Sequence, residues 1–231
     1  MGNGKYFFVS VNMKGIKNKI GWFFGLLATV SGIWIFLIKE DQNDYLKLLV
    51  FSKTEGFRHS AIEEGQKMLR NLANQNGFEV LFSEDAEVFN EKILADVNVI
   101  VFLNTTGDIL DEPQQLELQR FIQAGGGFVG IHSATDTEYK WPYYHQLVGA
   151  YFESHPEPAE ATINVLNRDH LSTHHLPQNW VHTDEWYNYR EINPEINVLM
   201  EVNEATYQGG KHGPNHPISW YRDFDGGRMW Y

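Results

Sequence analysis

Short apolar runs alternate with helical patterns between residues 46 and 131. The runs have the length of buried β-strands and cover residues 46–51, 78–82, 97–103 and 128–131. The helical patterns cover residues 60–76 and 90–95 and begin again at Asp111. Strands and helices that alternate at this spacing predict an α/β fold with a doubly wound, mainly parallel sheet and right-handed crossovers.

Capping residues mark the ends of two of these helices. Ser60 has Glu63 three places further on, which is the spacing of a capping box, and Gly77 ends the same helix. Asp111 caps a later helix, which has Pro113 in its first turn.

From about Trp141 the pattern loosens into polar and aromatic segments. They hold eight of the ten histidines and three further strand patterns, at residues 161–166, 196–202 and 217–221. Long irregular segments inside a compact domain are often functional. The final residues, Gly226 to Tyr231, have the pattern of a hairpin's returning strand. Because no helix follows, we expect the chain to be truncated at its C-terminus.

The N-terminal 45 residues have a different character. Residues 20–38 (IGWFFGLLATVSGIWIFLI) carry no charge, and as a helix they would extend about 28 Å, close to the thickness of a bilayer core. Four lysines and no acid precede them, so the lysine bias predicts a cytoplasmic N-terminus at residues 1–19. We expect a single-pass signal anchor, with the domain at residues 46–231 on the extracytoplasmic side. A cleaved signal peptide is the alternative and would leave a secreted protein.

The charge of the chain excludes some functions. The formal net charge is −12, and because residues 1–45 hold five lysines and three acids, the rest stands at −14. A surface this acidic repels phosphate backbones, so we expect no nucleic-acid partner. The chain has no cysteine, which excludes thiolate catalysis and cysteine-ligated metal sites.

Polar residues follow three of the predicted strands at the edge where open α/β sheets bind ligands. The glycine-rich stretch 125–130 leads into a strand-to-helix turn at His132, where some α/β enzymes place a nucleophile. Ser133 falls one place late for G-x-S-x-G, so nucleophilic acyl transfer is not expected. We expect these loops to form one crevice for a hydroxyl-rich ligand from Arg58, His59, Thr105, Thr106, His132 and Asp136. Taken singly, each has a structural alternative, such as a helix cap or a surface ion pair.

A second group of candidates lies in the later half. Asp184 and Glu185 precede Trp186 and Tyr187, which combines carboxylates for sugar hydroxyls with aromatic faces for sugar C–H surfaces. The two acids are alternatively a general acid and base. Neighbouring residues of an extended strand point to opposite faces, so a bend is needed for both to face one substrate. We add His216 to the substrate-binding candidates.

The histidines raise the question of a metal. The spacing H-E-x-x-H or a comparable motif is absent, so we expect no resident metal or other cofactor. The alternative is a divalent metal held by His59, His155, Asp184 and His216.

Several motifs together resemble those of the ThuA-like (trehalose utilisation) family. They are Phe-Ser-Lys-Thr with Gly-Phe-Arg-His (51–59), Gly-Gly-Gly-Phe-Val-Gly-Ile-His (125–132), Trp-Pro-Tyr-Tyr (141–144), His-Pro (155–156), Asp-Glu-Trp-Tyr-Asn (184–188) and His-Pro-Ile-Ser-Trp (216–220). The resemblance implies a flavodoxin-like fold similar to class I glutamine amidotransferases, and a role in carbohydrate metabolism. It also implies that His132 stands where amidotransferases have their cysteine, so glutaminase activity should be absent. Family members usually continue into a Gly-His-Thr turn and a closing helix that this chain lacks.

Three functions follow as hypotheses. The first is a membrane-tethered enzyme, an isomerase, lyase or hydrolase, that acts on trehalose-type disaccharides or keto-sugars. In it His132 and His59 are acid–base groups, Arg58 polarises a sugar oxygen, and Asp184 and Glu185 hold or deprotonate the sugar. The second is a sugar-binding module without catalysis, and the third is a metal-dependent hydrolase.

Overall fold

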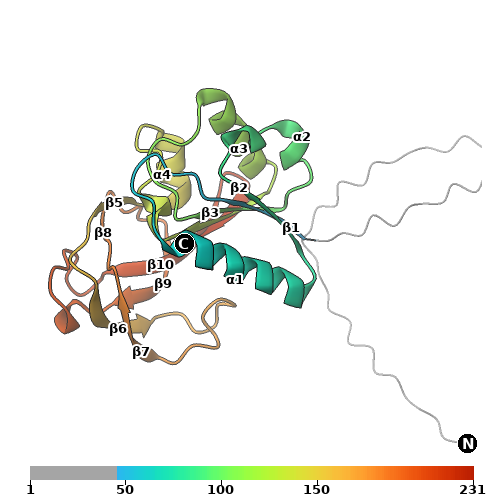
Figure 1. The fold of residues 1–231 in the computed structure, drawn as a ribbon. Helices are drawn as coiled ribbons and strands as arrows, with labels where there is room; N and C mark the ends of the chain where they lie inside the picture. The colour runs from blue at the N-terminus through green and yellow to red at the C-terminus, as the bar shows by residue number, and fades with distance from the viewer. Residues whose placement is uncertain (1–45) are drawn as a thin grey trace, which may run out of the picture. The chain divides into compact units, whose positions relative to one another are not determined.

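The computed structural model describes residues 46–231, and a nine-stranded sheet runs through this part of the chain in the order β2-β1-β3-β4-β11-β10-β9-β6-β7 (Figure 1). The segments 1–19 and 20–38, expected as a cytoplasmic N-terminus and a membrane anchor, lie outside the described residues. Within residues 46–231, no helix is both long enough and apolar enough to cross a bilayer.

Five strands form the parallel part of the sheet. They are β2 (Glu79–Ser83), β1 (Lys47–Phe51), β3 (Val99–Leu103), β4 (Gly127–Ile131) and β11 (Gly227–Trp230). The first four coincide with the predicted apolar runs to within two residues. Apolar side chains on both faces suit strands that are covered on both sides, because each face then contributes to a core.

Helices cover both faces of this parallel part (Figure 1). On one face, Leu69 of α1 (Ala61–Asn76) packs in a cluster with Val50 and Leu103. On the other face, Phe51 and Phe102 belong to a larger core formed with α2 (Glu91–Leu94), α3 (Glu112–Gln123) and α4 (Pro142–Val148). Neighbouring strand residues thus face opposite sides, and the doubly wound arrangement is confirmed.

The predicted helix ends are confirmed in part. Asp111 forms a full capping box with Gln114, and Gly77 ends α1 in the left-handed conformation at φ 71°. Ser60 makes no side-chain cap, which corrects the prediction. Its backbone is already helical, whereas a capping side chain needs an extended one. The carboxylate of Glu63 binds Arg58 instead.

The antiparallel part consists of β10 (Pro217–Phe224), β9 (Asn197–Val202), β6 (Ala159–Val165) and β7 (Asn179–Asp184). A separate pair joins β5 (Tyr151–Ser154) to β8 (Asn188–Arg190). The three strand patterns predicted in this half correspond to β6, β9 and β10. Sequence patterning missed β5, β7, β8 and α4. Three 3₁₀ turns cover Ala86–Val88, His132–Thr135 and Glu204–Thr206.

The predicted final hairpin is present, but its second strand has an unexpected neighbour. β11 pairs antiparallel with β10 and also parallel with β4, which places it inside the sheet. This position requires glycine at its start, because a Cβ at Gly227 would lie 2.5 Å from the carbonyl oxygen of Gly126. The last strand therefore joins the parallel and antiparallel parts of the sheet.

Candidate functional site

Two histidines at the carboxyl edge of the parallel strands begin the site. His59 lies in the loop after β1, and His132 follows β4 directly. His132 has a left-handed backbone, with φ at 52°. This conformation is uncommon for a residue with a side chain. The sharp strand-to-helix turn expected from the glycine-rich stretch is confirmed.

Glu185 joins these histidines from the segment after β7. One oxygen, Oε2, lies 3.2 Å from Nε2 of His132 and 3.7 Å from Nε2 of His59. The other oxygen, Oε1, lies 3.5 Å from Nε2 of His155. Three imidazoles therefore surround one carboxylate. We call His59, His132, His155, Glu185 and Tyr187 the Glu185 cluster.

Tyr187 completes the cluster from the side. Its hydroxyl lies 3.3 Å from Nε2 of His59, and its ring centroid lies 4.3 Å from that of His132 and 5.7 Å from that of His155. Burial, followed by the negative charge of Glu185, raises the pKa of Tyr187. The hydroxyl therefore stays protonated near neutral pH and is available as a hydrogen-bond donor.

Ser133 orients the imidazole of His59 through the ring nitrogen Nδ1. The side chain of Ser133 is buried, and its Oγ lies 3.3 Å from Nδ1 of His59. The sequence excluded Ser133 as a nucleophile, and no pattern indicated this orienting contact.

Burial lowers the pKa of both central histidines, His59 and His132. It lowers the pKa of His59, with the negative charge of Glu185 opposing the shift. It also lowers the pKa of His132, where a charge on His59 adds to the effect and Glu185 opposes it. Both imidazoles are therefore neutral at neutral pH, the form that accepts a proton.

Several predicted site residues lie outside the cluster. Arg58, with 42% of its side chain exposed, pairs with Glu63 and Glu84 at the surface. Thr105 is buried and bonds to Thr137 over 2.9 Å.

Thr106 and Asp136 are also engaged elsewhere. Thr106 is buried and donates to the carbonyl oxygen of Phe57 over 3.0 Å, so it fixes the loop that carries His59. Asp136 accepts a hydrogen bond from the hydroxyl of Tyr139 at 2.6 Å, and burial raises its pKa. Arg58 thus forms surface ion pairs, and Thr105 and Thr106 form hydrogen bonds that hold loops, as the alternatives for these residues described.

Of the aromatic, acidic and histidine candidates in the later half, some contact the cluster and others belong to the core. Trp186 is buried, and its indole donates to Ala159 over 2.7 Å, so it belongs to the core and presents no face to a sugar. The carboxylate of Asp184 accepts the backbone N–H of Glu185 at 2.9 Å. Of the two acids, Glu185 is the one that pairs with the imidazoles. His216 is fully buried and donates to the carbonyl oxygen of Tyr187 over 2.8 Å, so it supports the cluster through the main chain.

The cluster also contains the residues suited to a metal. The candidate ligand atoms of His59, His132 and Glu185 all lie within 4.8 Å of one another. The alternative set expected from the sequence does not assemble as a whole. His155 reaches Glu185, but His216 is enclosed by Glu204 and Tyr207.

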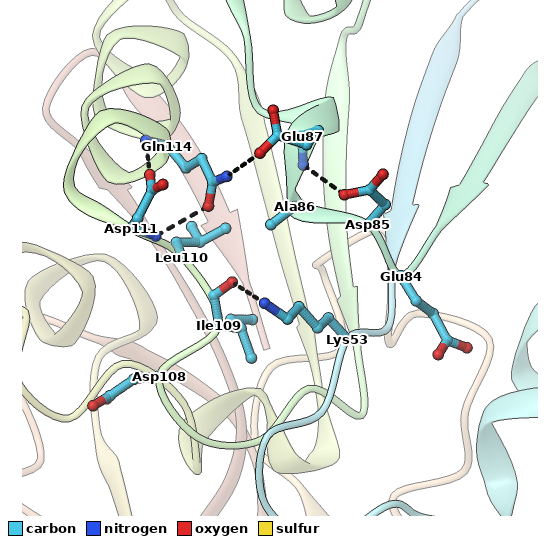
Figure 2. Close-up of a pocket in the computed structure, with 10 residues that line it drawn as sticks. All are labelled: Lys53, Glu84, Asp85, Ala86, Glu87, Asp108, Ile109, Leu110, Asp111 and Gln114. Carbon is cyan, nitrogen blue, oxygen red and sulfur yellow. Dashed lines mark hydrogen bonds between the residues drawn. The ribbon is translucent and has the colours of Figure 1, made fainter.

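A cavity of about 420 Å³ lies at the same sheet edge, outside the cluster (Figure 2). It lies between the segments that follow β1, β2 and β3 and has acidic walls. Two of its carboxylates cap helix starts, Asp85 at Glu87 and Asp111 at Gln114, and Lys53 donates to the carbonyl oxygen of Ile109. These groups are thus engaged in holding the fold, and none of the histidines faces them.

Comparison with known proteins agrees with the fold. The family model for ThuA, described as trehalose utilisation, matches residues 47–231. The chain belongs to the ThuA-like family. No curated protein matches the sequence.

Two solved structures of ThuA-like proteins share the architecture. One, from Bacteroides uniformis, has a TM-score of 0.67 and 21% identity, and the match covers 80% of each chain. The other, from Parabacteroides merdae, has a TM-score of 0.67 and 20% identity, covering 80% of this chain and 78% of that one. This ThuA-like protein thus has a flavodoxin-like fold, as the sequence motifs implied.

Proposed function

We propose that this ThuA-like protein processes a small carbohydrate, a trehalose-type disaccharide or a keto-sugar derived from one, by proton transfer at the Glu185 cluster. The observation that carries the proposal is the convergence of His59 and His132 on the single carboxylate of Glu185, at the edge where this fold class binds ligands. Membership of a trehalose-utilisation family supports the substrate class.

The first chemical step suits these groups. In a keto-sugar, the C–H bond beside the carbonyl breaks, its electron pair forms a C=C bond to the carbonyl carbon, and the carbonyl oxygen gains the negative charge. A neutral imidazole, His132 in our assignment, takes the proton, and Glu185 stabilises the imidazolium that results. The hydroxyl of Tyr187 is available to donate to the charged oxygen. In an isomerase the charged oxygen gains a proton, the hydroxyl on the deprotonated carbon loses one and becomes the new carbonyl, and the former carbonyl carbon is protonated. In a lyase the enolate re-forms the carbonyl and its C=C electron pair expels a leaving group from the next carbon along the chain.

Solvent exchange tests this step. The full chain is incubated with a keto-disaccharide in deuterium oxide, and NMR follows the loss of the proton signal beside the carbonyl. We expect His132→Asn to slow this exchange by about 100-fold or more, the usual contribution of a positioned acid–base group. Asparagine is chosen because it tolerates the left-handed backbone of position 132. The matched control is His175→Asn, an exposed histidine outside the cluster, which should exchange at the wild-type rate.

Two results would count against the enzyme. Equal exchange in the wild type and His132→Asn would exclude His132 as the acid–base group. Sugar affinity in calorimetry, with neither exchange nor product in the wild type, would instead indicate the non-catalytic binding module.

We also propose that residues 20–38 anchor the domain on the extracytoplasmic side, as the lysine bias indicates. A reporter that is active only in an oxidising compartment, fused after Tyr231, should be active in intact cells. An inactive reporter that is present at full length in the cytoplasm would contradict the assignment. N-terminal sequencing that begins beyond residue 30 would show a cleaved signal and a secreted protein.

A further inference from the structure

We propose that the Glu185 cluster binds a divalent transition-metal ion, held by Nε2 of His59, Nε2 of His132 and the carboxylate of Glu185. The binding itself rests on the geometry of these side chains. Its chemical use rests on the proposed function, which supplies the substrate class.

The spacing of the ligand atoms fits such an ion. Zinc binds imidazole nitrogen and carboxylate oxygen at about 2.0 to 2.1 Å, so two ligands of a tetrahedral site lie about 3.3 to 3.4 Å apart. The distances from Oε2 of Glu185 to the two imidazole nitrogens, 3.2 and 3.7 Å, lie on either side of this value. All three candidate ligand atoms lie within 4.8 Å of one another, so one ion can lie between them.

His155 lies beside the proposed ligands without being one of them. Its Nδ1 donates to the carbonyl oxygen of Pro156 over 2.8 Å, and its Nε2 lies 3.5 Å from Oε1 of Glu185. The oxygen of Glu185 that lies nearest to His59 and His132 is the other one, Oε2.

Neighbouring groups hold the ligands in place. Ser133 is buried and contacts Nδ1 of His59, the ring nitrogen that points away from the proposed ion. In metal-binding histidines the ring nitrogen that is not on the metal almost always forms a hydrogen bond to a neighbouring group, and that bond sets the ring orientation. His216 holds the main chain of Tyr187, two residues after Glu185.

Two histidines and one carboxylate leave coordination positions open, as in catalytic sites. An ion there would polarise a sugar carbonyl and its neighbouring hydroxyl. With Nε2 of His59 and of His132 on the ion, neither nitrogen can also take the substrate proton, so in the metal-loaded protein the proton acceptor is His155. Solvent exchange by zinc-loaded His155→Asn separates this arrangement from the metal-free one in which His132 is the base. Slowed exchange supports the bound ion, and exchange at the wild-type rate would contradict an ion at this site during turnover.

Equilibrium dialysis tests the binding without reference to activity. The full chain is stripped with chelator, dialysed against zinc or cobalt(II) chloride, and its metal content is measured by elemental analysis. We expect one ion per chain and a cobalt(II) absorption spectrum typical of mixed nitrogen and oxygen ligands. Glu185→Gln and His59→Gln should each weaken binding by about 100-fold or more, beyond the effect of losing a second-shell partner.

Circular dichroism checks that each variant is folded, and His175→Asn reports on adventitious binding by the exposed histidines at 174 and 175. The inference is overturned if the wild type binds no ion, or if Glu185→Gln and His59→Gln both bind as the wild type does. Bound metal without proton exchange would refute the proposed function alone. Full exchange in metal-free protein that does not bind zinc or cobalt would refute this inference alone.

Discussion

Glu138 ties together two loops at the sheet edge that carries the candidate site. The residue is 1% exposed, and its Oε1 accepts the backbone N–H groups of Ile109 at 2.7 Å and Leu110 at 2.8 Å. Its Oε2 accepts from Gln115 at 2.7 Å. One carboxylate thus holds the segment after β3 against the segment after His132. We predict that Glu138→Ala destabilises the domain strongly and that Glu138→Gln does so only mildly.

The magnitudes follow from the bonds. Glu138→Ala leaves two buried N–H groups without an acceptor, and each costs about 1 to 3 kcal/mol, so the loss is about 2 to 6 kcal/mol. This is a large share of an ordinary domain stability of about 5 to 15 kcal/mol. Glu138→Gln keeps an oxygen for both N–H groups, because both bonds fall on Oε1, and the amide of Gln115 can turn to accept. Its cost is about 1 kcal/mol.

Urea unfolding of the full chain, followed by tryptophan fluorescence, measures both variants. Burial raises the pKa of Glu138, and the N–H groups of Leu110 and Ile109 oppose part of the shift. A raised carboxyl pKa favours folding at low pH, so this contribution is lost as the pH rises through the folded-state pKa. The advantage of the wild type over Glu138→Gln should therefore shrink from pH 4 toward pH 7. Equal stabilities of the wild type and Glu138→Ala, or an advantage that grows with pH, would show that the Glu138 carboxylate does not hold the two segments together as described.

Three further variants test the fold and the limits of the site. Asp111→Ala removes the cap of α3 and should lower the unfolding free energy by about 1 kcal/mol, with full stability contradicting the capping box. Gly227→Ala should cost about 1 to 3 kcal/mol or more in the same assay, because the added Cβ meets backbone oxygens of Gly126 and Ile122, and a neutral effect would argue against β11 beside β4. Arg58→Ala removes only exposed ion pairs and should change stability by less than about 1 kcal/mol while leaving sugar-dependent proton exchange unchanged. A large loss of sugar-dependent proton exchange in Arg58→Ala would indicate that Arg58 takes part in the site.

The parallel half of the fold could be predicted because its signals are local. β1, β2, β3 and β4 each contain a short apolar run, and α1 and α3 each have an apolar face. β7 could not be predicted in this way, since Asn179, His182 and Asp184 stand in a mostly exposed strand that pairs with β6 through its backbone. The place of β11 beside β4 depends on a contact between residues about 100 positions apart.

The candidate site was predictable at the level of loops and less so at the level of side chains. His59 and His132 meet as expected, because parallel strands that end at one edge bring their loops together. Glu185 and Tyr187 reach them from the segment after β7, which the strand pattern did not place. Arg58 leaves this crevice because Glu63 and Glu84 offer it carboxylates at the surface. Sequence patterning does not show such a competing partner.

Histidine ring signals provide the most direct test of whether the Glu185 cluster is the functional centre. The full chain, labelled with ¹⁵N-histidine and assigned by single-histidine variants, is titrated with trehalose and with a keto-disaccharide. We expect the ring resonances of His59, His132 and His155 to shift with a common saturation curve, while those of His175 and His182 stay in place. Saturable binding that shifts only histidines outside the cluster, or no shift at all with a sugar that the protein turns over, would contradict it.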